Sequence, residues 1–167
     1  MTSRIYWSRT GGLVGNMAAH LLDILDDIAA LPVEVGGVIV PVYYNATMKN
    51  GYEEADLPAR VLQITNFEFA DVKSVSMRPP FNITIDWIIS DILLYRNAGL
   101  GRGLGDMAYD VTAYAEMYAD LVRTLGTIDW TRANVSGTFP VLEYPAASGK
   151  FYNAVVITVH IRDIVKG

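Results

Sequence analysis

The sequence predicts an α+β domain in which two amphipathic helices pack against one mixed or antiparallel β-sheet, with a long strand and extended hairpin loops. Two segments carry apolar residues at helical spacing, and the segments around them alternate or are rich in β-branched residues. Their order is helix, two or three strands, helix, two strands. The length of 167 residues suits one domain, which we place at residues 16–167 after a flexible N-terminal arm at residues 1–15.

The first helix is expected to begin after Asn16, a residue suited to an N-cap, and to end before Pro32. Acidic residues occupy one side of this helix. The opposite side is apolar and consists of Met17, Leu21, Leu22, Leu25, Ile28 and Ala29.

Three segments follow that we interpret as strands around a loop. Residues 33–45 are β-branched but contain glycines and a proline, which favours a bulged or edge strand. Residues 46–56 hold an Asn-Gly turn signal and form a loop or hairpin tip. Residues 57–65 form the next strand, and residues 66–77 alternate in part, which predicts a further strand.

Residues 81–95 form a long strand in which the alternation changes halfway. Apolar residues lie on one side as far as Ile89, after which Asp91 falls on that same apolar side. A β-bulge near residues 89–91 would restore the alternation and turn Asp91 to solvent; burial of both faces in the second half would also explain the pattern.

A glycine-rich loop at residues 97–105 leads to the second helix, which is expected to be capped by Asp106 and to end at Gly126. A linker containing Trp130 follows. Residues 138–145 and 151–164 then form a hairpin around the turn at residues 146–149.

The chain is more apolar and less charged than a solitary soluble domain of its size. Hydrophobic residues make up 51% and charged residues 19%, where about 25% charged is typical, and the mean hydropathy is +0.24. No window approaches about 18 uninterrupted apolar residues, so no membrane span is expected, and residues 1–16 do not form a signal peptide. The simplest explanation is that copies of the chain cover one another's apolar surface.

Charge and cysteine content exclude further classes of function. A formal net charge of −5 disfavours a nucleic-acid binder with an ordinary basic patch. The absence of cysteine excludes disulfides and thiolate metal sites. His20 and His160 have no partners at metal-ligand spacing, and no catalytic motif is present, so we expect no metal, no cofactor and no enzyme activity.

The glycine-rich loop is the one segment with a phosphate-binding context, because it lies between a strand and a helix and contains Arg102. Its glycines do not have the spacing of a dinucleotide-binding or P-loop motif, and Asp106 adds a negative charge at the helix start. The simpler interpretation is a loop that becomes ordered against a neighbouring subunit.

The candidate contact residues are chosen mainly among the numerous tyrosines and the segments expected at the edge of the sheet. Tyrosine gives a large contact area with a polar end and is enriched at interfaces. Tyr114 and Tyr118 have helical positions that favour the core. The candidates for a subunit interface are Val38, Val40, Tyr43, Tyr44, Tyr52, Arg102 and Tyr109.

The order and texture of the elements resemble the tail-terminator proteins of long-tailed bacteriophages. The resemblance spans residues 16–165 and is carried by LPARVL at 57–62, DILLYRNAG at 91–99, AYAEMYADLVRTL at 113–125 and YNAVVITVHIRDI at 152–164. It implies a structural virion protein without catalytic residues, located in the tail or neck and made in the host cytoplasm.

The resemblance also implies a ring of copies, hexameric in that family, at the head-proximal end of the tail tube. The implied partners are the chain itself, the tail tube protein and the neck or connector proteins. Genomic DNA would pass through the lumen without specific binding, and Glu53, Glu54 and Asp56 are candidates for an acidic lumen lining. No membrane is implied.

Three alternatives stay open. The chain is another phage neck or tail-tube subunit, or a small phosphate- or nucleotide-binding enzyme that uses residues 99–105, or a ligand-free adaptor with an exposed apolar edge.

Overall fold

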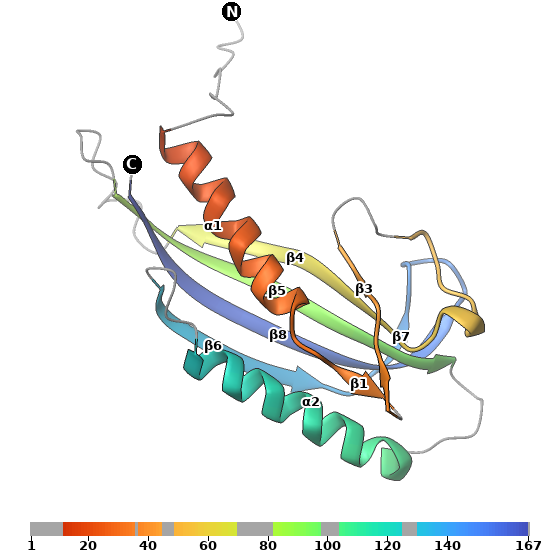
Figure 1. Cartoon of the computed structure of the whole chain (residues 1–167). Coiled ribbons are helices and arrows are strands. Elements are labelled where there is room, and N and C mark those ends of the chain that lie inside the picture. Colours follow the sequence, from red (N-terminus) through yellow and green to blue (C-terminus); the bar gives the residue numbers. More distant parts are fainter. Residues whose placement is uncertain are drawn as a thin grey trace, which may run out of the picture.

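The computed structural model describes residues 12–35, 37–44, 49–69, 82–97, 104–124 and 130–166, in which two helices cover one face of a long twisted sheet (Figure 1). The elements are α1 (Gly12–Ala29), β1 (Glu34–Val35), β2 (Val38–Ile39), β3 (Val42–Tyr43), the 3-10 helix η2 (Glu54–Asp56), β4 (Ala59–Phe69), β5 (Asn82–Asn97), α2 (Leu104–Thr124), β6 (Trp130–Thr138), β7 (Val141–Glu143) and β8 (Phe151–Lys166).

The main sheet has six strands in the order β3-β4-β5-β8-β6, with β7 also paired to β8. β3 runs parallel to β4, and all the other neighbours in this sheet are antiparallel. β1 and β2 form a separate two-stranded hairpin. The predicted α+β class with a mixed sheet and long strands is therefore confirmed.

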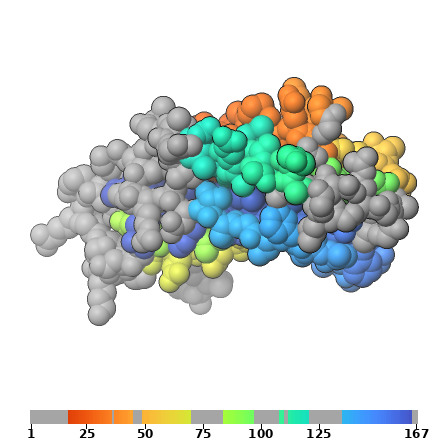
Figure 2. All heavy atoms as spheres, turned by 90° about the horizontal axis from the view of Figure 1, so that it is seen from below, coloured from red at the N-terminus to blue at the C-terminus, as the bar shows by residue number. Residues whose placement is uncertain are grey.

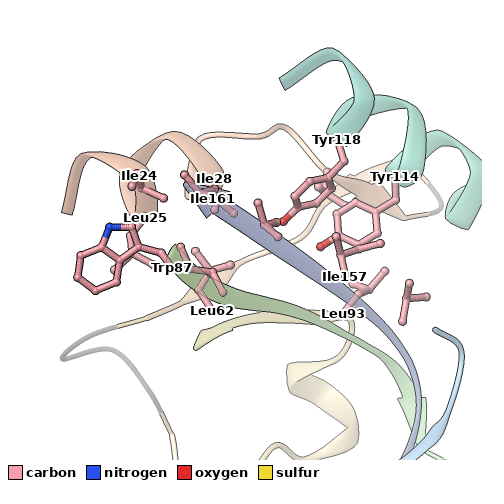
Figure 3. Close-up of a cluster of buried hydrophobic side chains, with 14 of the residues drawn as sticks. Ile24, Leu25, Ile28, Leu62, Trp87, Leu93, Tyr114, Tyr118, Ile157 and Ile161 are labelled. Carbon is pink, nitrogen blue, oxygen red and sulfur yellow. The ribbon is translucent and has the colours of Figure 1, made fainter. Parts of the chain in front are cut away.

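The main core lies between the sheet and both helices (Figure 3). α1 contributes Ile24, Leu25 and Ile28, and α2 contributes Tyr114 and Tyr118, all of which are buried. Along the antiparallel strands β5 and β8, alternate residues point to this face, because successive side chains of a strand face opposite ways. Figure 2 shows α2 lying along β6 on the outer flank of this layer.

A second buried cluster lies on the opposite face of the sheet, but only over part of it. Its members are Tyr52, Ala59, Val61, Ile92, Leu94, Tyr144, Tyr152 and Ala154. Every residue of β5 from 91 to 95 is consequently buried, whichever face it points to. Of the two explanations that the sequence left open for the change of pattern, burial of both faces is thus the correct one, and no register shift lies at residues 89–91.

The irregularities lie elsewhere, in β4 and at the end of β5, where the register against β8 shifts between Leu94 and Arg96. The register of β4 against β5 shifts between Ile64 and Asn66, so Thr65 is the extra residue. β4 continues through this bulge to Phe69, which makes residues 66–69 part of β4; the separate strand predicted at 66–77 is wrong for these residues, and residues 70–77 lie outside the described ranges.

Several predicted boundaries also need correction. α1 begins at Gly12, four residues before the expected cap, and α2 begins at Leu104, so Asp106 lies inside the helix. Residues 130–138, read as a linker and the start of a strand, form β6. Residues 33–45 are divided into β1, β2 and β3, with Gly37 at a φ of 78° in the turn between β1 and β2. The remaining part of the predicted arm, residues 1–11, lies outside the described residues.

Candidate assembly surface

The large hydrophobic side chains that are well exposed fall into two groups within the described part of the chain. The first, which we call the β4 end, consists of Leu22, Ile64, Phe67 and Phe69. The second, which we call the β7 end, consists of Val38, Ile39, Tyr109, Phe139, Val141 and Phe151.

The β4 end is a preformed aromatic surface that continues the core outward. The Phe67 ring lies 6.2 Å from the ring of Trp87, which is itself buried, and 6.1 Å from the ring of Phe69. Phe67 nevertheless leaves 55% of its surface exposed. Because its pairing partner on β5 is Trp87, Phe67 points to the face of the sheet that carries the helices.

The β7 end lies at the other end of the long strands. Val141 and Phe151 project from the paired strands β7 and β8, and each is at least half exposed. The β1–β2 hairpin lies at this same end, as Figure 1 shows. Tyr109 belongs here because it lies near the start of α2, and Figure 1 shows that α2 begins at this end of the sheet.

The distance between the two groups can be estimated along the strand β8. Phe69 is in register with Ile85, which is in register with Asp163, near the end of β8. Phe151 is the first residue of that strand. Twelve strand residues span about 40 Å, so the two apolar groups lie at opposite ends of an elongated sheet.

The structure divides the predicted interface residues between surface and core. Val38 and Tyr109 are exposed, by 62% and 88%. Val40 and Tyr52 are buried inside the subunit, so we assign them to its core. The remaining candidates are Tyr43 and Tyr44, which are half-buried, and Arg102, which lies outside the described residues.

Two of the three acids predicted for a lumen, Glu53 and Asp56, lie beside lysines. Glu53 accepts a hydrogen bond from Lys150, and Asp56 lies 2.9 Å from Nζ of Lys49. The hydrogen bond from Lys49 is the main reason that the pKa of Asp56 is lowered. Glu54 is exposed. The local charge is therefore mixed rather than purely acidic.

Asp91 is fully buried, which corrects the expectation that a bulge turns it to solvent. Nη2 of Arg60 lies 2.6 Å from its Oδ2, and the Tyr118 hydroxyl donates to the same oxygen. Both charged side chains are inaccessible. Burial alone would lower the pKa of Arg60, but the charge and hydrogen bonds of Asp91 outweigh it and hold the guanidinium charged.

Arg60 also fastens the end of α1 to the sheet. Its Nη1 donates to the carbonyl oxygen of Leu31 and its Nη2 to that of Ile28, each at 3.0 Å. Carbonyls at a helix C-terminus lack partners within the helix. These two each accept one backbone N–H, from Leu31 and Val33, and the buried arginine adds a second donor to each. This role was not visible in the sequence, because the pattern LPARVL is typical of an ordinary strand.

The two histidines also find carboxylate partners. Nδ1 of His20 lies 2.9 Å from Oδ2 of the buried Asp163, which joins α1 to β8. His160 lies on the opposite face, with its Nε2 3.9 Å from Oδ2 of Asp86. No group of three metal-ligating side chains gathers among the described residues.

Two further findings bear on function. No described helix has the length and apolar character needed to cross a membrane. Neither a scan against models of protein families nor a search of curated proteins found a match. The phosphate-binding interpretation concerns residues 99–105, of which 99–103 lie outside the described ranges.

The strongest surface feature was only partly visible in the sequence. Phe67 and Phe69 alternate with polar residues, but that alternation did not reveal which face would be left uncovered. Phe139, Val141 and Phe151 read as ordinary strand residues of a hairpin. Only the register of the folded strands shows that these side chains lie at one end.

Proposed function

We propose that this chain is a structural subunit that joins copies of itself head to tail into a closed ring, and that the ring is the tail terminator of a long-tailed bacteriophage. The observation that carries the proposal is the separation of the exposed apolar residues into the β4 end and the β7 end. In the proposed ring, the β4 end of one copy packs against the β7 end of the next.

The geometry favours this arrangement over a two-fold dimer. A two-fold contact that pairs one apolar end with the same end of its partner would leave the other apolar end uncovered. A head-to-tail contact uses two different patches, and repeating it around a ring covers both ends of every copy. Large exposed apolar patches on a soluble protein are typical of interaction sites.

The choice of a tail terminator among ring-forming proteins rests on the resemblance in element order. A ring that caps the tail tube and meets the neck would be a structural rather than a catalytic component. The acids Glu53, Glu54 and Asp56 are proposed to lie toward the lumen, with Lys49 and Lys150 moderating their charge.

The first experiment measures assembly with two blocking variants. Phe67→Asp should disable the β4 end and Phe151→Asp the β7 end, because each places a charge in an apolar contact. Light scattering and negative-stain microscopy should find rings for the wild type and monomers for each variant alone. Ala115→Asp, at an exposed residue of α2 that is not next to any member of the two groups, is the matched control and should assemble.

Mixing the two variants identifies the type of contact. A head-to-tail contact leaves one intact β7 end and one intact β4 end in the mixture, so the variants should form a one-to-one dimer that cannot grow. If either variant still assembles like the wild type, the proposed contact is wrong.

The second experiment tests the terminator role with purified tail tube protein. The ring should bind one end of the tube and stop its elongation. Incorporation along the tube would indicate a tube subunit, and binding only to connector proteins would indicate another neck component. A chain that associates with neither itself nor tube or neck proteins would overturn the proposal.

A further inference from the structure

The β4 end has features that specify what covers it in an isolated subunit. Among the described residues, β3 pairs only with Arg60 and Val61 of β4, so the strand has an open edge from Leu62 onward. The bulge at Thr65 interrupts that edge, and the Asn66 side chain accepts the backbone N–H of Phe67 at 2.9 Å. These features disfavour the addition of a strand, so an occupant must bind through side chains.

The apolar residues of the β4 end lie beside acidic residues of α1. The Tyr44 hydroxyl donates to Asp26 at 2.8 Å, which places Asp26 on the side of α1 that faces β3 and β4. Leu22 precedes Asp26 by four residues and so shares that side of the helix. Asp23 and Asp27 lie nearby; burial and the charges of Asp23 and Asp26 raise the pKa of Asp27. An occupant should therefore be apolar with positive flanks.

The segment that precedes α1 has this composition. Residues 1–11 contain one apolar run, Ile5-Tyr6-Trp7, flanked by Arg4 and Arg9, and no acidic residue. We infer that this run packs on Phe67 and Phe69 of its own chain, with the two arginines beside the acids of α1.

The length of the chain permits this contact within one molecule. His20 is bonded to Asp163, which lies two strands from Phe69, and Gly12 is eight residues before His20. These spacings put Gly12 on the order of 20 Å from Phe69. Residues 5–7 precede Gly12 by five to seven residues, or about 17–25 Å of extended chain. A short tether gives a local concentration in the millimolar range, which favours the same chain over a second copy.

The contact has a consequence that rests on the proposed function. In the ring, the β7 end of a neighbour needs the same β4 end, so the segment must leave before the contact forms. Removal of residues 1–11 should then promote self-association of the subunit.

The test of the contact uses the absence of cysteine. A nitroxide on Ser8→Cys should broaden the methyl signals of Leu22 and Ile64, while the signals of Ile39 and Val141 at the β7 end stay sharp. Tyr6→Ser with Trp7→Ser should abolish the broadening, and so should Phe67→Ser. Phe151→Ser, the matched change at the other end, should leave it intact.

A mixed sample separates the possible occupants. In this sample, an isotope-labelled chain without a nitroxide is mixed with a chain that carries the nitroxide but no isotope label. The signals of the isotope-labelled chain should stay sharp. Broadening of these signals would assign the site to a second copy and overturn the inference. Absence of broadening at the β4 end in the wild type, or broadening that persists without Tyr6 and Trp7, would also overturn it. Failure of the ring experiments alone would remove the consequence for assembly but not the contact.

Discussion

Two carboxylates of β5, Asp86 and Asp91, each meet an arginine, but on opposite faces of the sheet. The Asp91–Arg60 pair lies beneath the helices, and both of its side chains have no exposed surface. The Asp86–Arg162 pair lies on the open face, with a nearly buried carboxylate and an arginine side chain that is 43% exposed. Arg162 donates two hydrogen bonds to the Asp86 carboxylate, at 2.8 and 2.9 Å. The hydrogen-bond geometry of this bidentate pair is at least as good as that of the Asp91–Arg60 pair.

The difference lies in what each pair connects. Arg60 and Asp91 join β4 and β5 to the end of α1 and, through Tyr118, to α2. Asp86 and Arg162 join two neighbouring strands that already share a backbone ladder. Two ion pairs of the same residue types therefore contribute differently to the fold. The buried pair positions the helix layer, whereas the exposed pair adds to an existing contact between strands.

The largest effect is expected from Asp91→Ala. The substitution leaves the Arg60 guanidinium buried without its counter-charge, which costs about 3–5 kcal/mol of the free energy of unfolding. Urea unfolding followed by circular dichroism measures the loss. A loss below about 1 kcal/mol would mean that water reaches Arg60 and that the two pairs are equivalent.

Replacing the whole buried pair separates charge from packing. The double variant Arg60→Met with Asp91→Leu should regain most of the stability lost in Asp91→Ala, because apolar residues of similar volume often replace a buried ion pair without loss. The carbonyls of Ile28 and Leu31 lose the Arg60 donor and keep only their backbone donors, so amide hydrogen exchange at the end of α1 should remain faster than in the wild type. No recovery would show that Arg60 acts mainly through these carbonyls.

The next largest loss of stability is expected from Tyr118→Phe, for which Tyr114→Phe is the matched comparison. Tyr118→Phe removes a hydrogen bond to a charged group and should cost about 1.5–3 kcal/mol. The Tyr114 hydroxyl is buried and finds no hydrogen-bond partner among the described residues, so Tyr114→Phe should be nearly neutral. Equal losses in the two variants would contradict the assigned contacts.

Alkaline titration tests the same tyrosines without mutation. Burial first, and then the charge of Asp91, raise the pKa of Tyr114 and Tyr118 well above its usual range. The folded state then keeps phenol protons that the unfolded chain loses above about pH 10. Stability is fully present below that pH and falls above it, by up to about 1.4 kcal/mol per pH unit for each tyrosine.

Tyr114→Phe is the control for this pH dependence and should make the fall with pH shallower. Tyr52 and Tyr144 have pKa values raised chiefly by burial, so some slope should remain in that variant. A wild-type stability that is constant between pH 9 and 11 would contradict the burial of these phenols.

The sequence predicted the fold class because helical spacing and strand alternation are local signals. It predicted a long strand at residues 81–95, and it left open whether a bulge or two-sided burial explains Asp91. That choice depends on which segments cover the second face, and Tyr52 and Tyr144 are far from Asp91 in the chain. Pairing between distant segments has no local signature.

The candidate surface was predictable to a smaller degree. Val38 and Tyr109 were named from residue type and edge position, and both are exposed. Val40 is two residues from Val38 and has the same chemistry, yet its N–H bonds the carbonyl of Val33 and its side chain is buried. The excess of apolar residues that suggested self-association thus has two sources, a core on both faces of the sheet and the two exposed ends.

The smallest effect is expected on the open face, where Arg162→Ala should cost only a small fraction of the loss in Asp91→Ala at low ionic strength. Because Arg162 is partly in solvent, this contribution should shrink as salt is raised beyond about 0.1 M, where charges are screened within about 10 Å. The loss in Asp91→Ala should not change with salt, since no ions reach that pair. His160→Ala is the matched control on the same face, because its nitrogen is 3.9 Å from Asp86 and it makes a weaker contact. If Arg162→Ala costs as much as Asp91→Ala, or is as insensitive to salt, the open face is covered in solution, and the sheet has a second partner surface there.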